Sequence, residues 1–165
     1  MPVSGEAYRQ IGRAAAGAVS VVTAYEGDSR TVIGLTVTSF VTLSFEPPLV
    51  MFAIQHGASC YPAMIASRSF GVSLLSAQQA PVARRFATRG ADKSAGTHLE
   101  TGQVLDVPLI AESLVQVECM TNQTFISGDH AIIVGLVEAA RPRDGEPLLY
   151  FARQFGSFTP LSVQP

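Results

Sequence analysis

Three hydroxyl side chains lie within four positions of the segment GLTVTSF, residues 34–40. Thr36 and Thr38 point to the same side of a strand because side chains alternate, and Ser39 follows where the strand ends. The hydroxyls and free backbone N–H groups of such a strand end suit the polar edge of a flat heteroaromatic ring, which offers carbonyl oxygens and ring nitrogens. The same pattern also fits an ordinary strand with threonines on its solvent face, and the sequence leaves both interpretations open.

The segment QHGASCYP, residues 55–62, joins an apolar run to a predicted helix. Gly57 lets the backbone turn, and Ser59 is placed to cap the helix. Because the first N–H groups of a helix have no partner within it, this junction favours a bound phosphate. In the alternative interpretation Ser59 caps only its own helix, and the two interpretations are compatible.

Cationic side chains occur at two further places. Arg84 and Arg85, followed by Phe86, fall near the end of a predicted helix, where guanidinium groups match phosphate and a ring can pack on another ring system. The alternative is a solvated arginine pair whose charges interact favourably with the helix dipole.

His130 opens a strand after the turn at residues 127–129 and is placed to reach a pocket mouth. The alternative is a surface histidine at a hairpin.

Composition excludes several other kinds of site. The formal net charge of −2 lacks the basic field that nucleic-acid binding requires. Cys60 and Cys119 are predicted to be free thiols, and the three histidines are scattered, so no zinc spacing occurs and a metal-free chain is expected. The sequence has no glycine-rich nucleotide loop after a strand and no nucleophile elbow.

The 165 residues fit one domain, expected over residues 1–165 with a core from about 8 to 156. The start lacks the basic and apolar pattern of a signal peptide, and no apolar run approaches the ~20 residues of a membrane span, so a cytoplasmic location is expected. Hydrophobic residues make up 47% of the chain and charged residues 15%. This balance fits either a generous core or an apolar surface covered by a partner or cofactor.

A series of short strands must position these candidates. Predicted helices span residues 8–18, 59–66 and 76–86, and predicted strands span 19–25, 31–39, 49–55, 70–75, 114–125, 131–139 and 148–151. The apolar run at 49–55 is typical of a strand buried on both faces. Ser76 and Gln79 have the form of a capping box, and residues 88–104 are predicted to be a surface loop. Since most links between strands are too short for crossover helices, the pattern predicts an antiparallel barrel.

In order and spacing these segments resemble the flavin reductase-like family, which includes the reductase components of two-component flavin monooxygenases. The resemblance is carried by GLTVTSFVTLSFEPPLVMFAIQ, SRSFGVSLLS, ARRFA, SGDHAIIVGLVEAARPRDGEPLLYF and the opening YRQIGRAAAGAVSVVTAY. It implies a mainly β fold, the FMN-binding antiparallel split β-barrel of Greek-key type with a few short helices. It also implies a homodimer, with the flavin near the subunit interface, and a monooxygenase partner that receives reduced flavin.

The resemblance further implies an NAD(P)H:flavin oxidoreductase, in which NADH or NADPH reduces FMN or FAD. The cofactor-binding residues that it implies are Thr36, Val37, Thr38, Ser39, Ala53, Ile54, Gln55, Ser59, Arg84, Arg85, Phe86 and Tyr150. Within this set, Ser59 would help to hold the phosphate and Tyr150 would lie at the mouth of the site. His130 would lie near the nicotinamide, as the one residue with a catalytic role.

Two places depart from the family pattern. Residues 55–58 lack the arginine or lysine and the extra serine often found there, which weakens the phosphate assignment. Phe155 stands where a tyrosine before glycine is common, which removes a hydroxyl. These departures could alter flavin preference or retention.

Three alternatives to the reductase stay open: a flavoprotein that retains its flavin and reduces another acceptor, a non-catalytic flavin-binding barrel, and a purely structural interaction barrel.

Overall fold

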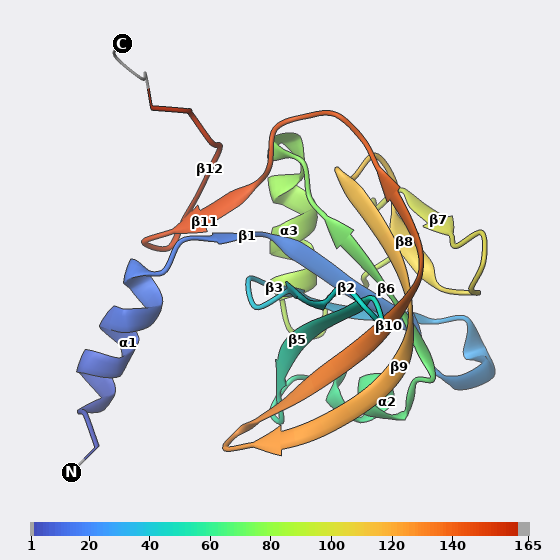
Figure 1. Cartoon of the computed structure of the whole chain (residues 1–165), viewed down its shortest axis with the longest axis horizontal. Coiled ribbons are helices and arrows are strands. Elements are labelled where there is room, and N and C mark those ends of the chain that lie inside the picture. Colours follow the sequence, from blue (N-terminus) through green and yellow to red (C-terminus); the bar gives the residue numbers. More distant parts are fainter. Residues whose placement is uncertain (1, 162–165) are drawn as a thin grey trace.

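The computed structural model describes residues 2–161 and is built around one seven-stranded antiparallel sheet (Figure 1). Its strands are β2 (Ser20–Tyr25), β3 (Val32–Val37), β4 (Val41–Ser44), β5 (Leu49–Gln55), β6 (Ser69–Leu74), β9 (Val115–Ser127) and β10 (His130–Pro142). The hydrogen-bonded order is β3-β2-β6-β9-β10-β5-β4. The predicted antiparallel, mainly β fold is therefore confirmed. The sheet is not a closed barrel, because β3 and β4 remain its two edge strands.

Two small sheets and three α-helices complete the fold. The first small sheet contains β1 (Gly17–Ala18), β11 (Leu149–Phe151) and β12 (Gln154–Gly156), and the second pairs β7 (Leu99–Thr101) with β8 (Pro108–Ile110). The helices are α1 (Gly5–Ala14), α2 (Tyr61–Ala66) and α3 (Ala80–Ala87). α2 and α3 both contact β3, whereas α1 projects away from the body (Figure 1). The site described below lies where α3 meets β3.

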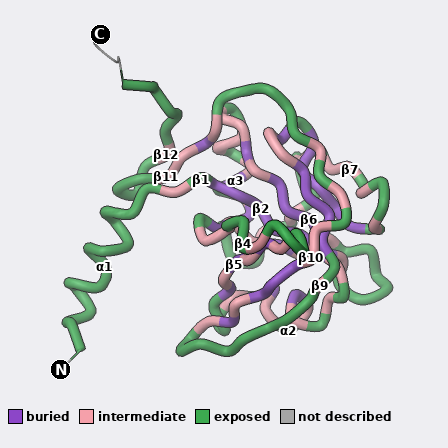
Figure 2. The backbone as a smooth tube through the Cα atoms, viewed as in Figure 1, coloured by how far each residue is buried: buried purple, intermediate pink, exposed green. Residues whose placement is uncertain are grey.

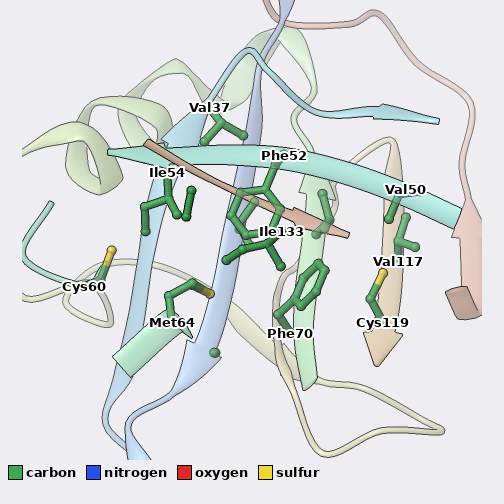
Figure 3. Close-up of a cluster of buried hydrophobic side chains, with 14 residues drawn as sticks. Val37, Val50, Phe52, Ile54, Cys60, Met64, Phe70, Val117, Cys119 and Ile133 are labelled. Carbon is green, nitrogen blue, oxygen red and sulfur yellow. The ribbon is translucent and has the colours of Figure 1, made fainter. Parts of the chain in front are cut away.

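The larger core cluster fills the inner face of the curved sheet (Figure 3). Phe52 from β5 and Phe70 from β6 meet edge to face, with ring centroids 5.3 Å apart. Gly135 on β10 accommodates the Phe70 ring, since a Cβ atom at this position would lie 2.5 Å from its Cζ atom. Figure 2 shows burial concentrated in the central strands, while α1 and the far end of the β9–β10 hairpin are exposed.

The prediction that residues 49–55 are buried on both faces is wrong. Burial alternates along β5: Val50, Phe52 and Ile54 are buried, whereas the residues between them are only half-buried. Successive side chains of a strand face opposite sides, and only one side of β5 faces the core. The apolar residues Met51 and Ala53 are therefore free to line another surface, and Ala53 lines the cavity described below.

The helix predicted to start at Ser59 begins at Tyr61 instead, so the cap assignment of Ser59 is wrong. Cys60 is the N-cap residue, and no side chain donates or accepts a capping hydrogen bond there. The capping box is confirmed, because the Ser76 N–H donates to Gln79 Oε1 at 3.0 Å. It opens a short 3₁₀ turn that leads into α3.

Short strands account for the other differences. The predicted surface loop at residues 88–104 contains β7, which pairs with the unpredicted β8. β4 and β12 were also not predicted, because strands of three or four residues offer too few positions for an alternating pattern.

The N-terminal helix spans residues 5–14 rather than 8–18. The prediction of two free thiols is confirmed, and both lie buried.

A buried carboxylate fixes the segment between β7 and β8. Glu118 on β9 is 1% exposed and accepts hydrogen bonds from the backbone N–H groups of Gln103, Val104 and Leu105, at 2.6 to 2.9 Å. Burial by itself raises the pKa of Glu118, but these three donors and the charge of Arg141 together hold that pKa below its ordinary value. The ionised carboxylate is therefore part of the folded structure.

Replacing Glu118 with glutamine removes this charge, and we expect the free energy of unfolding to fall by about 2 kcal/mol at pH 7. Because the folded state has the lower pKa, the stabilisation is present above the unfolded pKa of ~4.3 and is lost as the pH falls through the folded pKa. Urea unfolding at pH 7 and pH 3 measures this, and the difference between wild type and Glu118→Gln should narrow at pH 3. The control is Glu138→Gln, an exposed position on β10; an equal loss there at pH 7 would contradict the assignment.

Candidate functional site

A cavity of about 610 Å³ opens between β3, β5 and the C-terminal end of α3. Its volume lies in the range of ~300–1,000 Å³ that small-molecule sites occupy. Four parts of the chain form its walls: residues 34–39; Ala53, Gln55 and residues 57–60; residues 86–89 with Lys93; and His130. We call this space the ring cavity.

The ring cavity lies where β3 and β5 approach each other without forming a ladder. β4 pairs with β5 only as far as Met51, so the same edge of β5 has no strand partner at Ala53. The Ser39 hydroxyl takes that place, because its Oγ atom accepts a hydrogen bond from the Ala53 N–H at 3.0 Å and lies 3.4 Å from the Ala53 carbonyl oxygen. One side chain thus fixes the spacing of the two walls.

The three hydroxyls predicted to act together have different positions. The Thr36 hydroxyl donates to the Ala83 carbonyl oxygen at 2.7 Å and so fastens β3 to α3. Ser39 is bonded to β5, and only Thr38 is exposed. Two of the hydroxyls therefore brace the cavity walls, and Thr38 is the one left for a ligand.

Phe86 packs its ring edge directly against β3. It is only 2% exposed, and a Cβ atom at Gly34 would lie 3.0 Å from Phe86 Cε1 and 2.4 Å from the Val22 carbonyl oxygen. Because no larger residue fits at Gly34, the helix end can approach the strand closely. This contact places residues 86–89 beside the ring cavity.

His130, the first residue of β10, also lines the ring cavity. It pairs with Gln55 across the β10–β5 ladder, and its Nδ1 atom lies 2.7 Å from Asp129 Oδ1. The hydrogen bond to His130 holds the pKa of Asp129 below its ordinary value. The Asp129 carbonyl oxygen also accepts from the His56 N–H at 2.9 Å, which ties the two loops together. Since Asp129 occupies Nδ1, the Nε2 atom of His130 is the one available to another partner.

Two basic side chains in the walls were missed by the sequence analysis. Lys93, the only lysine of the chain, donates from Nζ to the carbonyl oxygens of Arg85, Phe86 and Thr88 at 3.0, 3.3 and 2.7 Å. Burial lowers the pKa of Lys93; the nearby Cys60, in its ionised form, opposes this shift, and the charge of Arg85 adds to it. Arg89 is exposed at the same wall. Two basic side chains from the segment after α3 therefore line the ring cavity, although residues 55–58 contain neither arginine nor lysine.

Nine of the predicted site residues line the ring cavity: Thr36, Val37, Thr38, Ser39, Ala53, Gln55, Ser59, Phe86 and His130. Arg84 and Tyr150 line a neighbouring cavity of about 890 Å³, which shares residues 36–38 with the ring cavity. Ile54 is 0% exposed and faces the core cluster, because it alternates with Ala53 and Gln55 along β5. Arg85 lies beside Gly96, outside both cavities.

The donor set of the ring cavity suits an anionic organic molecule. Its walls combine apolar side chains with the hydroxyls of Thr38 and Ser59 and the charges of Arg89 and Lys93. Within residues 2–161, no group of three histidine, cysteine or acidic side chains is placed to hold a metal ion. In the same part of the chain, no helix has the length and apolar character needed to cross a membrane.

Comparison with known proteins agrees with this geometry. Residues 12–159 match the family described as the flavin reductase like domain. The chain is 36% identical over 160 residues to the NADH:riboflavin 5'-phosphate oxidoreductase of Streptomyces pristinaespiralis, covering 96% of this chain and 90% of that one. It is also 36% identical to the reductase component of the 4-hydroxyphenylacetate 3-monooxygenase of Thermus thermophilus, covering 91% and 94%.

A solved structure gives the same likeness in three dimensions. The NADH:FAD oxidoreductase of Streptomyces globisporus, in complex with NAD and FAD fragments, superposes with a TM-score of 0.88 at 29% sequence identity. The match covers 99% of each chain. The resemblance expected from the sequence is therefore confirmed over nearly the whole length.

Proposed function

The chain belongs to the flavin reductase-like domain family, and we propose that it transfers hydride from NADH to a flavin, FMN or FAD, held in the ring cavity. The observation that carries the proposal is the ring cavity itself, with Ser39 bracing its two walls and Thr38 exposed between them. The relatives named as NADH-dependent flavin oxidoreductases support the choice of donor.

A bound flavin would supply the hydride-accepting ring, so the chain itself needs no acid–base triad. The work left to the residues is to orient two flat rings and exclude water. Hydride transfer needs the two reacting atoms within ~3–3.5 Å, which demands rigid walls. Residues 36–39 and Ala53 are suited to hold one side of the ring, since hydrogen bonds to α3 and β5 already fix their backbone.

Cationic groups support a phosphate position at the other end of the ring cavity. Ser59, Arg89 and Lys93 all line it, and Arg89 takes part in no ion pair within residues 2–161. We assign the flavin phosphate to these three side chains. Lys93 contributes mainly its charge, because backbone carbonyl oxygens already accept from its ammonium group.

His130 is proposed as the residue next to the nicotinamide. Its hydrogen bond to Asp129 orients the imidazole and leaves Nε2 for the carboxamide of the donor. Tyr150 is proposed to lie near the same mouth. It lines the neighbouring cavity, which shares residues 36–38 with the ring cavity.

We also propose that two copies associate and that the curved sheet is a split barrel of Greek-key type. The bridge from Ser39 to Ala53, which joins the sheet's two ends without a ladder, supports the split barrel. α1 supports the homodimer: none of its ten residues is buried, and a free helix this short is marginal in water. Its exposed Tyr8 and Ile11 would pack on the partner copy.

A monooxygenase in the cytoplasm is the proposed recipient of the reduced flavin. The Thermus thermophilus relative is the reductase component of a monooxygenase, which supports the partner. The two buried, unpaired cysteines agree with a reducing compartment, where disulfides are rare.

The proposal predicts that purified protein oxidises NADH rapidly only when FMN, FAD or riboflavin is added. Absorbance at the NADH band, followed with each flavin at saturation and without flavin, measures this. No acceleration with any of the three flavins would overturn the reductase assignment. Tight flavin binding without NADH oxidation would instead identify a non-catalytic flavin carrier.

Loss of the proposed phosphate contacts should weaken the binding of FMN and leave the binding of riboflavin unchanged, because riboflavin has no phosphate. We expect Arg89→Gln to raise the Kd for FMN about fivefold, as for an exposed ion pair, and Lys93→Met to raise it about tenfold. Flavin fluorescence titrations measure both constants. Because Lys93 also caps α3, Arg89→Gln decides the assignment if Lys93→Met does not fold. Equal changes for FMN and riboflavin would contradict it.

Removing the imidazole should weaken the use of the nicotinamide more than the binding of flavin. We expect His130→Ala to raise the KM for NADH about fivefold, the effect of one lost hydrogen bond, with a smaller change in the Kd for FMN. His98→Ala is the matched control, because His98 is exposed and lines neither cavity. An unchanged KM for NADH in His130→Ala would remove this residue from the site.

A further inference from the structure

The acidic neighbour of His130 decides what the imidazole of His130 can bind. Asp129 is the second residue of the two-residue turn between β9 and β10, directly before His130. Its Oδ1 atom lies 2.7 Å from His130 Nδ1. Because an ionised carboxylate accepts hydrogen bonds and donates none, this contact requires the imidazole to carry a proton on Nδ1.

The carboxylate of Asp129 is ionised in this contact, because the hydrogen bond from His130 holds the pKa of Asp129 below its ordinary value. The two side chains are 76% and 43% exposed, and an exposed pair of this kind contributes little to stability. A small effect is enough here, since the partner of one ring nitrogen sets which of the two nitrogens carries the proton.

The backbone keeps Asp129 beside the imidazole. Ser127 pairs with His130 across the turn, and Gly128 has a φ of +60°, which lets two residues close the turn. The Asp129 carbonyl oxygen also accepts a hydrogen bond from the His56 N–H at 2.9 Å. The fold itself, rather than a ligand, thus brings the carboxylate to Nδ1.

The other ring nitrogen of His130 is left as a hydrogen-bond acceptor. A neutral imidazole with its proton on Nδ1 has a lone pair on Nε2. Within the described residues, the bond to Asp129 is the only side-chain hydrogen bond of His130, which lines the ring cavity beside its cross-strand partner Gln55. A ligand group that binds Nε2 must therefore donate a proton.

We propose that Asp129 is a positioning residue that makes His130 Nε2 a hydrogen-bond acceptor, so that the site selects the N–H of the nicotinamide carboxamide. The inference rests on the proposed function, in which His130 lies next to the nicotinamide. The carboxamide offers an N–H donor and a carbonyl oxygen, and the geometry assigns the donor to His130. An analogue of NADH that keeps the carbonyl oxygen and lacks the N–H should lose this contact.

The position of the proton can be measured by ¹⁵N NMR, which distinguishes the two neutral forms of an imidazole from the doubly protonated ring. The chain has three histidines, so the signals of His130 are those missing from His130→Ala. At pH 8 and without flavin, we expect a proton on Nδ1 and none on Nε2 in the wild type. Asp129→Ala should lose this preference. A protonated Nε2 in the wild-type protein would overturn the inference.

The kinetic test compares NADH with reduced 3-acetylpyridine adenine dinucleotide, in which a methyl group replaces the amide nitrogen and the net charge is unchanged. We expect the ratio of kcat/KM for NADH to that for the analogue to fall about fivefold in Asp129→Ala, the effect of one hydrogen bond. His130→Ala should lower the ratio equally, and the double variant no further, because both changes remove the same acceptor.

A matched control removes another exposed carboxylate. Asp144→Ala, outside the ring cavity, should leave the ratio at the wild-type value. An unchanged ratio in Asp129→Ala would overturn the inference. A fivefold rise in the Kd for flavin with an unchanged ratio would also overturn it, and would assign the N–H to the flavin instead.

Asp129→Asn separates positioning from a loss of structure, because asparagine has the same shape and can either accept from Nδ1 or donate to it. The NMR spectrum shows which nitrogen then carries the proton. With the proton on Nδ1 the ratio should stay at the wild-type value, and with the proton on Nε2 it should fall about fivefold. A ratio that does not follow the proton would contradict the role of Asp129.

The outcome can be separated from that of the reductase proposal, because the NMR measurement needs neither flavin nor NADH. An unprotonated Nε2 in a protein that oxidises NADH with no flavin would remove the reductase function, and with it the nicotinamide as the partner of His130. Flavin-dependent oxidation of NADH by a protein with a protonated Nε2 would remove the inference and keep the function.

Discussion

The hydrogen bond from the Ala53 N–H to Ser39 Oγ is the contact on which the rest of the site depends. The seven-stranded sheet runs from β3 at one edge to β4 at the other and never closes. β4 pairs with β5 no further than Met51, and the short link between β3 and β4 reaches β5 at Ala53 through the Ser39 hydroxyl. A full ladder would bring these strands ~4.8 Å apart and leave no room for a ligand between them. A single side-chain bridge fixes the walls and still leaves a cavity.

The second feature that organises the site is the set of positive side chains around α3. The protein is slightly acidic, yet three arginines without ion pairs in the described part of the chain line the two cavities around α3: Arg84, Arg89 and Arg153. Lys93 adds a fourth positive charge while it caps the C-terminal end of that helix. The close packing of Phe86 on Gly34 places this helix end between the two cavities. Positive side chains thus lie on both sides of β3.

The sequence predicted what local patterns determine. The strand at residues 49–55, the Ser76–Gln79 capping box and the antiparallel class all follow from periodicity and capping chemistry. Contacts between residues that are far apart in the sequence could not be predicted. Thr36 and Ser39 looked like free ligands, but their partners lie 47 and 14 residues away and make them braces. Lys93 lies in a polar loop with no local signal, and only the fold shows that it lines the ring cavity.

The central claim is that the cavity between β3 and β5 receives the flavin ring. A crystal structure of the protein with FMN tests it most directly. Our account predicts density for the three-ring system against residues 36–39 and Ala53, with the phosphate near Ser59, Arg89 and Lys93. Flavin bound elsewhere on the molecule, or Thr38 and Ser39 covered by the chain's own side chains so that no ring can enter, would contradict it.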